Sequence, residues 1–536
     1  MKVVKPDGFF GPVAPTPKGR KAKSETKTSS FSLKSINPFA VTPQPLWVVF
    51  SDPHHTNCID VVFVNEDGEP LTEQTKTLLQ NGGLPKTARM PKGKLAHAIL
   101  FGKKSTFLVV CVGMKSLRIL GGRITRILKD EQFTVARIHA DPLSFIKKRD
   151  VPERFQAFLH GMQTPTYSFD LKTGEKKKRS LETIYFSGNI GIPVEQAEKI
   201  ARFVKKLVFA EHFSRVLIDL PPQAGCMSTT DMVRLVKQIA ADDAANISLE
   251  IIEGEDLDTK GLNALWSVGK GRTDAPPALA VLSYSGGGKE KPTVALVGKC
   301  LVFDTGGENL KSSGIEDMKL DMSGAAMALA TVLMAKTLKA PINLVATLAI
   351  ADNAVSGSSY HPSSVLRSYR GKTIEVLDTD AEGRLALADA VEYTEEQYKP
   401  DYLITLATLT GACVVALGSD FAGLFAKTPE MVEVIEAASK KTWNKVWHMP
   451  LAEAEHTVLK ESKIADVANL GERWGGAITA AKFILEEFVH TKHAAHLDVA
   501  GVAAEAPDAT GVKSAFATGW GPALLWEVVH MLSKNK

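Results

Sequence analysis

The chain has 536 residues, of which 44% are hydrophobic and 23% charged, and its net charge is +4 at pH 7. This length exceeds one ordinary hydrophobic core, so we expect two or three domains. Residues 1–40 hold eight lysines and arginines against two acids, a net of +6 that leaves −2 for the rest of the +4 total. The body of the protein therefore lacks the basic surface of a typical nucleic-acid-binding protein.

The cysteines and the apolar runs indicate where the protein acts. Five scattered cysteines without a CxxC pair predict reduced thiols in an intracellular protein. We find no run of about 18–20 apolar residues and no apolar segment behind the amino terminus, so we expect no membrane contact and no secretion by the usual route. A cytoplasmic location follows, with the mitochondrion as the alternative because a lysine-rich amino terminus can be a presequence.

The first part of the chain predicts an extension, a domain and a linker. Residues 1–44 are rich in Pro, Gly, Lys, Ser and Thr, a composition typical of a flexible basic extension. Residues 45–192 alternate short apolar runs with helix-compatible stretches and predict a smaller N-terminal α/β domain. Apolar residues at helical spacing predict a linker helix over 193–213.

Residues 214–536 predict a second, larger α/β domain. Its apolar strands include 215–221 (RVLIDLP), 292–299 (PTVALVGK), 373–378 (TIEVLD) and 401–408 (DYLITLAT). Strands that are apolar throughout indicate a central mixed, largely parallel sheet covered by helices on both faces. The helices expected between them cover 228–241, 318–338 and 383–397.

Charged residues follow these apolar runs in short segments rich in glycine. The segments read VGKCLVFDTGG (297–307), MKLDMSGAA (318–326) and LDTDAEGRL (377–385). Ligands in open α/β sheets bind beyond the carboxyl ends of the strands, so we expect the segments to converge. Buried carboxylates must be compensated, and a cluster of them implies cations.

The carboxylates of this cluster match two divalent cations in charge. Asp304, Asp321, Asp380 and Glu382 bring four negative charges, which two such ions would neutralise. If Asp304 and Glu382 bridge the two ions, a hydroxide would be held between the ions. Oxygen ligands and one amine, that of Lys299 after loss of its proton, suit Zn²⁺, Mn²⁺, Co²⁺ or Mg²⁺.

Two further positively charged side chains of this region, those of Lys311 and Arg384, are not needed as metal ligands. Lys311 can remain protonated and stabilise the negative oxygen of a tetrahedral intermediate. Arg384, at the start of a predicted helix, can hold a planar anion. Taken singly, the acids are more often helix caps, but their occurrence with two lysines inside 86 residues (299–384) favours one site.

The segment LDTDAEGRL resembles the signature NTDAEGRL of the leucyl aminopeptidase family of dinuclear metal peptidases. Further segments also resemble this family, and together the matches cover essentially all of residues 290–505. They are VGKCLVFDTGG, EDMKLDMSGAA, LATLTGACVVALG, ADVANLGERWGGAITAAKFI and HLDVAG. Three features depart from the family pattern: Asp378 stands for the Asn of the signature, the stretch 311–321 is one residue shorter, and Trp474 is bulky in a Gly-rich segment. None removes a ligand.

The resemblance implies a role for each matching position. Lys299, Asp304, Asp321 and Glu382 would bind the tighter metal, and Asp304, Asp380 and Glu382 the exchangeable one. Lys311 and Arg384 would be catalytic, with a bicarbonate on Arg384 as general base. The pocket for the first side chain would be lined by Met318, Thr408, Gly411, Ala500 and Ala503. The family pairs a smaller N-terminal domain with the catalytic domain and assembles as a homohexamer.

We therefore expect a metal-dependent aminopeptidase that releases N-terminal residues, preferably Leu or similar apolar ones, by attack of a metal-bridging hydroxide on the first peptide bond. Its partners would be peptides with a free amino terminus. The main alternative is a nucleic-acid-binding or scaffold protein that uses its basic tail. A dinuclear phosphoesterase is a second alternative, but such sites usually use histidine ligands, and no histidine lies near the acidic motifs.

Overall fold

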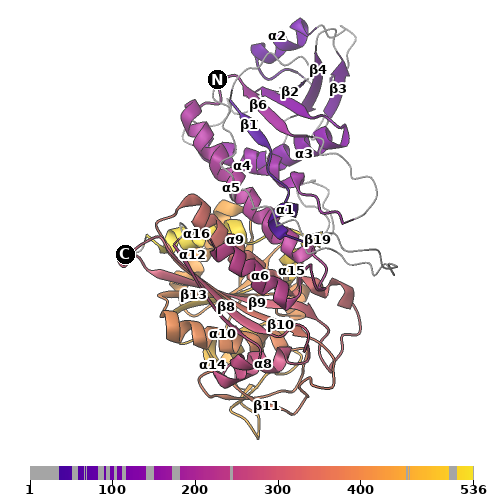
Figure 1. Ribbon diagram of the computed structural model, residues 1–536. Helices are drawn as coiled ribbons and strands as arrows, with labels where there is room; N and C mark the ends of the chain where they lie inside the picture. The colour runs from indigo at the N-terminus through magenta and orange to yellow at the C-terminus, as the bar shows by residue number, and fades with distance from the viewer. Residues whose placement is uncertain are drawn as a thin grey trace, which may run out of the picture.

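The computed structural model describes residues 36–534 except 51–57, 65–66, 68, 83–89, 92–96, 102–104, 112–115, 140–149, 172–180, 242–245, 454–456, 458 and 506–515. Residues 1–35, most of the predicted basic extension, lie outside the described residues. Within the predicted extension, residues Pro38–Val41 form the short helix α1, capped by the Asn37 side chain. The chain forms two lobes, one above the other in Figure 1.

The upper lobe is built on a six-stranded sheet in the order β1-β6-β5-β2-β4-β3, in which only β3 is antiparallel to its neighbour. Strand β2 is buried at every position, as its mostly apolar sequence favours, and this burial includes Asp60. The strands are β1 (Trp47–Val49), β2 (Ile59–Val64), β3 (His97–Phe101), β4 (Thr106–Cys111), β5 (Val135–His139) and β6 (Thr183–Ser187), and the helices are α2 (Glu73–Asn81), α3 (Leu117–Asp130) and α4 (Val151–Gln163), followed by the 3₁₀ turn Thr164–Thr166.

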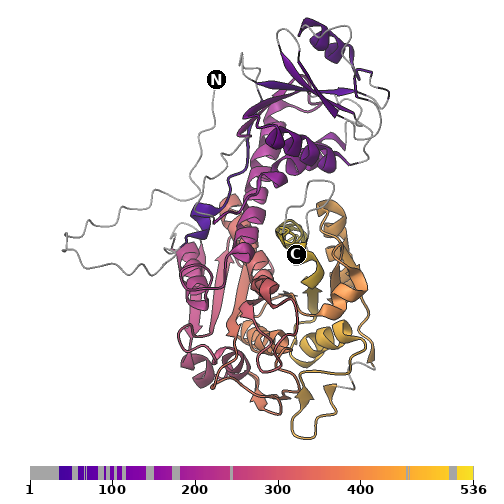
Figure 2. The ribbon, with the colours of Figure 1, turned by 90° about the vertical axis from the view of Figure 1, so that its right-hand side faces the viewer.

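Helix α5 (Val194–Asp219) runs from the upper lobe down into the lower one (Figures 1 and 2). It continues six residues beyond the predicted linker helix and includes most of the predicted strand 215–221, so that strand prediction is wrong. Its last turns are buried from all sides, polar residues included, so the short apolar run 216–218 has no helical periodicity to distinguish it from a buried strand.

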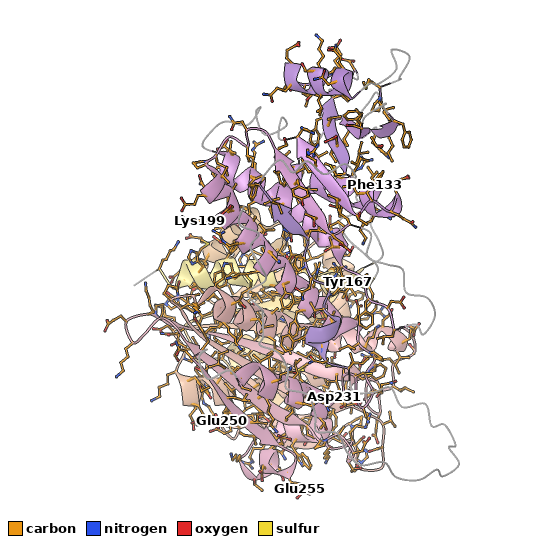
Figure 3. All side chains as sticks on the ribbon, turned by 45° about the horizontal axis from the view of Figure 1, so that its top comes forward. Phe133, Tyr167, Lys199, Asp231, Glu250 and Glu255 are labelled. Atoms are coloured by element: carbon orange, nitrogen blue, oxygen red, sulfur yellow. The ribbon has the colours of Figure 1, made fainter. Side chains whose placement is uncertain are left out.

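Tyr167 lies where the lobes meet (Figure 3). Its hydroxyl donates a hydrogen bond to Asp219 at the end of α5, and the Arg215 guanidinium lies 3.7 Å from the centre of its ring. Arg215 Nε also donates to the carbonyl of Ala517, 2.9 Å away in the lower lobe. The junction is thus built around buried polar groups of α5 that bind both lobes.

The lower lobe is built on an eight-stranded mixed sheet in the order β15-β14-β17-β13-β9-β10-β8-β7. Its centre, β17-β13-β9-β10, is parallel, and antiparallel pairs flank it on both sides. The strands are β7 (Ile247–Glu253), β8 (Ala278–Ser285), β9 (Thr293–Asp304), β10 (Asn343–Asn353), β13 (Tyr402–Ala407), β14 (Ala422–Ala426), β15 (Val446–His448) and β17 (His493–Asp498). The predicted fold class, two α/β domains with a largely parallel central sheet, is confirmed.

Helices cover both faces of this sheet. On β9, Val294 and Leu296 belong to the core shared with α9, whereas Ala295 and Val297 belong to the core shared with α10, as the alternation of a strand requires. The helices are α6 (Thr229–Ala240), α7 (Glu255–Thr259), α8 (Asn263–Gly269), α9 (Ser323–Leu338), α10 (Glu382–Tyr398), α11 (Gly411–Leu417), α12 (Pro429–Thr442), α14 (Gly476–Glu487), α15 (Ala500–Ala503) and α16 (Pro522–Leu532).

Two features of the lower lobe differ from the prediction. The predicted strand 373–378 is only the three-residue β12 (Thr373–Glu375), which lies outside the central sheet in a small sheet with β11 (Val365–Arg367) and β16 (Val467–Ala468). Residues Ile315–Leu338, the 3₁₀ helix η5 (Ile315–Met322) followed by α9, form a stretch long and apolar enough to cross a membrane, but 83% of its most apolar part is buried inside the protein. It is a core helix.

Candidate metal and catalytic site

The site is built at the end of β9, the central strand of the lower lobe. Asp304, the last residue of β9, and Lys299, in the middle of the strand, are both buried, and the neighbouring strand β10 ends with Asn353 opposite Asp304. Asn353 Nδ2 donates to Asp304 Oδ1 at 2.8 Å. This bond leaves the other oxygen of Asp304 free to face the site.

Asp321 reaches Lys299 because helix α9 packs unusually close to the sheet. A Cβ at Gly324 would lie 2.0 Å from the carbonyl oxygen of Leu406 on β13, so no larger residue fits there. The approach brings Asp321, at the end of η5, to 2.8 Å from Lys299 Nζ. Thr408 completes this side, since its hydroxyl donates to Asp321 Oδ1 at 2.7 Å.

The loop 376–381 and the start of α10 bring the other two acids, Asp380 and Glu382. Thr379 N donates to Asn309 Oδ1 at 2.9 Å and Asn309 N donates back to Thr379 Oγ1 at 2.8 Å, which joins this loop to the one after β9. Glu382, the first residue of α10, lies 2.7 Å from Lys299 Nζ. A Cβ at Gly383 would lie 2.6 Å from that amine, so the glycine of the predicted motif makes room for the lysine.

Lys311 closes the cluster from the loop after β9. Its ammonium lies 2.7 Å from Asp304 Oδ2 and also pairs with Asp380. Two ammonium groups thus face four carboxylates, and two negative charges remain without a cation from these residues. The shorter stretch between Lys311 and Asp321 does not prevent this lysine from reaching the acids.

The excess of negative charge changes the protonation of the site. Burial, and then the nearby Asp304 carboxylate, raise the pKa of Glu382 to about 8. Burial also raises the pKa of Asp321 to about 7, against the opposing effect of Lys299. For Lys299, burial disfavours the charged form, but the carboxylates of Asp321 and Glu382 outweigh it and raise the pKa above that of free lysine. Without further cations, the acids therefore retain protons near neutral pH.

The arrangement fits divalent cations. Carboxylate oxygens of Asp304, Asp380 and Glu382 lie within 4.8 Å of one another. Glu382 Oε2 is buried and receives no hydrogen bond from the described residues, a state that costs free energy unless a cation occupies the position. Oxygen donors and one amine are hard ligands of the kind that Zn²⁺, Mn²⁺, Co²⁺ and Mg²⁺ accept.

Arg384 lies one turn into α10, behind the acids. It is almost fully buried, which lowers the pKa of its guanidinium to about 10 and leaves it charged at neutral pH. Nη1 donates to the carbonyl of Asn469 at 2.9 Å, whereas Nε has no partner among the described residues. An unpartnered N–H on a buried cation is suited to an anion.

The predicted pocket residues lie on three neighbouring elements. Asp498, at the end of β17, accepts hydrogen bonds from the Thr410 hydroxyl and from Ala500 N, which joins the start of α11 to the start of α15. A Cβ at Gly411 would meet no atom within 4 Å, so space is open there. Ala503 is buried, and Met318 lies on η5, one turn before Asp321. Their lining of a pocket stays a prediction.

Three buried polar residues that hold the site were missed by the sequence reasoning. Thr379, Asn353 and Asn469 are each fully buried and bind the loops that carry the acids. Their uncharged side chains lie up to 170 residues from the first lysine, so no local charge pattern exposes them. Thr379 and Asn469 do lie inside the matching segments LDTDAEGRL and ADVANLGERWGG, which were the available signals for these two residues.

Comparisons with known proteins agree with this geometry. The model of the cytosol aminopeptidase family, catalytic domain, matches residues 212–526. A probable cytosol aminopeptidase of Chlorobaculum tepidum is 38% identical over 395 residues, which are 72% of this chain and 76% of the relative. One from Xanthomonas oryzae pv. oryzae is 37% identical over 409 residues, 74% of this chain and 79% of the relative.

Solved structures share the fold of both lobes. A mutant of tomato leucine aminopeptidase superposes with a TM-score of 0.78 at 26% identity and covers 91% of this chain and 96% of its own. The bottromycin maturation enzyme BotP, in complex with Mn, gives a TM-score of 0.73 at 23% identity over 89% of this chain and 100% of its own. At this identity, the likeness to BotP shows the fold alone.

Proposed function

Because the chain belongs to the cytosol aminopeptidase family, whose members are metal-dependent hydrolases, we propose that it removes the first residue of peptides with a free amino terminus and prefers leucine or similar apolar residues. The observation that carries this proposal is the convergence of four carboxylates on Lys299 and Lys311 from three separate segments. A charge excess of this kind, with a buried unpartnered carboxylate oxygen, suits a pair of divalent cations.

Five residues would hold the two ions in this proposal. Asp304 and Glu382 would bridge them, with Lys299 and Asp321 on one ion and Asp380 on the other. Bound ions would supply Lewis-acid chemistry, which polarises the scissile carbonyl and makes water more acidic. Lys299 must release its proton to bind, so the ions displace protons from the site.

The remaining two residues would act on the reacting atoms. In the metal-free protein the carboxylates of Asp304 and Glu382 outweigh the effect of burial and raise the pKa of Lys311. We propose that Lys311 also keeps its proton in the loaded enzyme, because it binds no ion. Its N–H groups can then donate to the carbonyl oxygen as that oxygen becomes negative. We propose that Arg384 holds a bicarbonate, the base that carries a proton from the attacking water to the leaving amine.

The substrate pocket is proposed from the same geometry. The space above Gly411 and the apolar or small side chains of Met318, Ala500 and Ala503, with Thr408 on Asp321, would surround the first side chain of the peptide. A free α-amine would bind at the ion held by Asp380, which would restrict the enzyme to the amino terminus of its substrates.

Hydrolysis of leucine p-nitroanilide by protein loaded with Mn²⁺, Co²⁺ or Zn²⁺ tests the proposal. Asp380→Ala and Lys311→Ala are expected to abolish most turnover, and N-acetyl-leucine p-nitroanilide is expected to be refused. Equal cleavage of free and acetylated substrates would contradict the role of the amine. Activity that survives removal of all metal by chelators would contradict the proposal as a whole.

We also propose that the protein acts in the cytoplasm, in line with the names of the relatives, and that it assembles as the homohexamer that the family resemblance implies. Exposed apolar side chains on the lower lobe support an interface between subunits: Val415 is 90% exposed, Trp474 76% and Trp447 57%. Sedimentation equilibrium should give about six times the 57.9 kDa of one chain, and a monomer at micromolar concentration would contradict this assembly.

A further inference from the structure

Asn469 lies beside the loop that carries the second pair of acids. It follows β16, which pairs in parallel with β12 and sets Ala468 opposite Glu375. Asn469 N continues this pairing, since it donates to the carbonyl of Glu375 at 2.9 Å. The residue is 0% exposed, although it belongs to a small sheet at the edge of the lobe. The strand pairing therefore places the buried amide side chain of Asn469 next to the loop 376–381.

The amide side chain binds this loop on both sides of Asp380. Its Oδ1 accepts hydrogen bonds from Leu377 N at 2.8 Å and from Asp378 N at 3.3 Å. Its Nδ2 donates to the carbonyls of Asp378 at 2.7 Å and Ala381 at 3.3 Å. Every polar atom of the side chain is thus used by one loop.

The main chain of the same residue binds the proposed anion site. Its carbonyl accepts a hydrogen bond from Arg384 Nη1 at 2.9 Å. One residue therefore fixes the loop before α10 through its side chain and the guanidinium of the first turn of α10 through its backbone. No other residue in the described part of the chain contacts both in this way.

The chemistry of the loop explains why an amide is needed. The loop has no regular structure, and its N–H and C=O groups must find partners where Leu377 and Asp380 approach the surface. Among uncharged side chains, an amide offers two N–H donors together with an oxygen that can accept two hydrogen bonds, which matches the four contacts made here. A carboxylate at this position would repel two carbonyl oxygens and would add to the negative charge of the site.

We propose that Asn469 is a positioning residue, which holds the loop 376–381 and the Arg384 guanidinium in the geometry that binds metal and anion. This inference rests on the proposed function, since it assumes that Asp380 and Glu382 are metal ligands. Residues that orient metal ligands typically change metal affinity about 10–100-fold when they are replaced.

Titration of the full-length, metal-free protein with Co²⁺ tests the proposal, by calorimetry and by the visible absorption of the bound ion. Asn469→Asp and Asn469→Ala should weaken the second Co²⁺ equivalent about 10–100-fold. They should also lower kcat for leucine p-nitroanilide at low Co²⁺, with partial recovery at high Co²⁺ and little change in KM. Added metal also stabilises the folded state by mass action, so circular dichroism of the metal-free variants, which should match that of the parent, distinguishes a loss of affinity from a defect in folding.

Asn343→Asp is the matched control. Asn343 also accepts one backbone N–H, from Gly287, and donates to two carbonyls, those of Gly288 and Lys291, in a turn away from the acids. The same chemical change there should leave Co²⁺ affinity within about twofold of the parent, because no metal ligand lies on that turn.

Each outcome decides the proposal. Parental affinity for both Co²⁺ equivalents in Asn469→Asp and Asn469→Ala would overturn it. If Asn469→Asp does not fold, Asn469→Ala carries the test. Loss of folding in both, while Asn343→Asp folds, would also overturn it, since Asn469 would then support the lobe rather than the loop. Failure of the proposed function is seen separately, in a parent protein that binds fewer than two Co²⁺ or does not hydrolyse the substrate.

Discussion

Each lobe buries acidic side chains in a parallel sheet, but the two lobes compensate them differently. In the upper lobe, Asp60 on β2 lies 3.1 Å from Arg137 Nη1 and 3.0 Å from His139 Nε2, both on the neighbouring strand β5. In the lower lobe, four acids share two lysines. A buried acid matched by an arginine from its own sheet is a structural contact, whereas an excess of acids indicates a site for added cations.

The largest effect should follow the loss of a shared acid. Glu382→Gln removes one charge and one oxygen ligand, so we expect kcat/KM to fall by at least about 10³ and the bound metal to fall below two ions per chain. Activity on leucine p-nitroanilide and metal content by mass spectrometry measure this. Glu392→Gln, a buried acid on the same helix, is the control and should keep both ions. If Glu382→Gln still binds two ions and keeps full turnover, the acids of the lower lobe do not need added cations, and the proposed difference between the lobes is wrong.

The lysines of the lower lobe can be separated by role. Lys311→Ala removes a donor to the reacting oxygen but no metal ligand, so kcat should fall by about 10²–10³ while both ions remain bound. Lys291→Ala, whose amine binds the carbonyl of Ser533, should match the parent. A loss of metal in Lys311→Ala would instead assign this lysine to the binding of the ions.

The excess of acids should also appear in the pH dependence of stability. The pKa values of Asp321 and Glu382 are raised to about 7 and about 8, so these two groups bind more protons in the folded, metal-free protein than in the unfolded chain between about pH 4 and pH 8. Its stability should therefore decrease as pH rises through this range. The pKa values of Lys299 and Lys311 are also raised, but they do not change the stability in this pH range, because both lysines are protonated in the folded and in the unfolded chain below about pH 10.

Thermal unfolding with a chelator present measures this dependence. The metal-free Tm should be lower at pH 8 than at pH 5.5, and added Mn²⁺ should raise the Tm most at the higher pH, where fewer protons compete. A metal-free Tm that rises between these pH values would show that the acids are already compensated, as Asp60 is.

Replacement of Asp60, the acid of the upper lobe that is paired within its own sheet, should change stability but not activity. Asp60→Asn breaks its pairing with Arg137 and His139, and we expect the free energy of unfolding to fall by about 2 kcal/mol with kcat unchanged. Urea unfolding measures the change, and Glu182→Gln, at an exposed position, should remain within about 0.5 kcal/mol of the parent. A fall in kcat for Asp60→Asn would mean that the lobes are coupled in catalysis.

The smallest effect is expected at Asp378, where the chain departs from the family signature. Its Oδ1 accepts a hydrogen bond from Asp380 N at 2.8 Å, and an asparagine oxygen can accept the same bond. Asp378→Asn should therefore keep the loop and change only the charge, with less than about tenfold weaker binding of the second ion. Calorimetry with Co²⁺ measures it, and loss of an ion would show that Asp378 is a ligand itself.

The sequence identified the charged part of the site because charge is costly at the ends of apolar strands. Lys299, Asp304 and Asp321 belong to motifs with glycines that allow close packing, and the structure shows why at Gly324 and Gly383. Helix α10 and the fold class were also predicted correctly, because the hydrophobic pattern of a long helix or of an apolar strand can be recognised in the local sequence. The strand predicted over 373–378 was placed in the central sheet, which is wrong, because the three residues of β12 do not reveal their partner strands.

The sequence by itself determined which side chains bring charge to the site and that they need cations, because this follows from residue type and local pattern. Only the tertiary structure decided that two lysines face four acids, that α5 continues through residues 215–219 as a helix, and that Asn469 holds the loop from 90 residues away. The physical reason is that these features are contacts between distant segments. Their partners are neutral amides, backbone groups and neighbouring helices, which carry no signal in the local sequence.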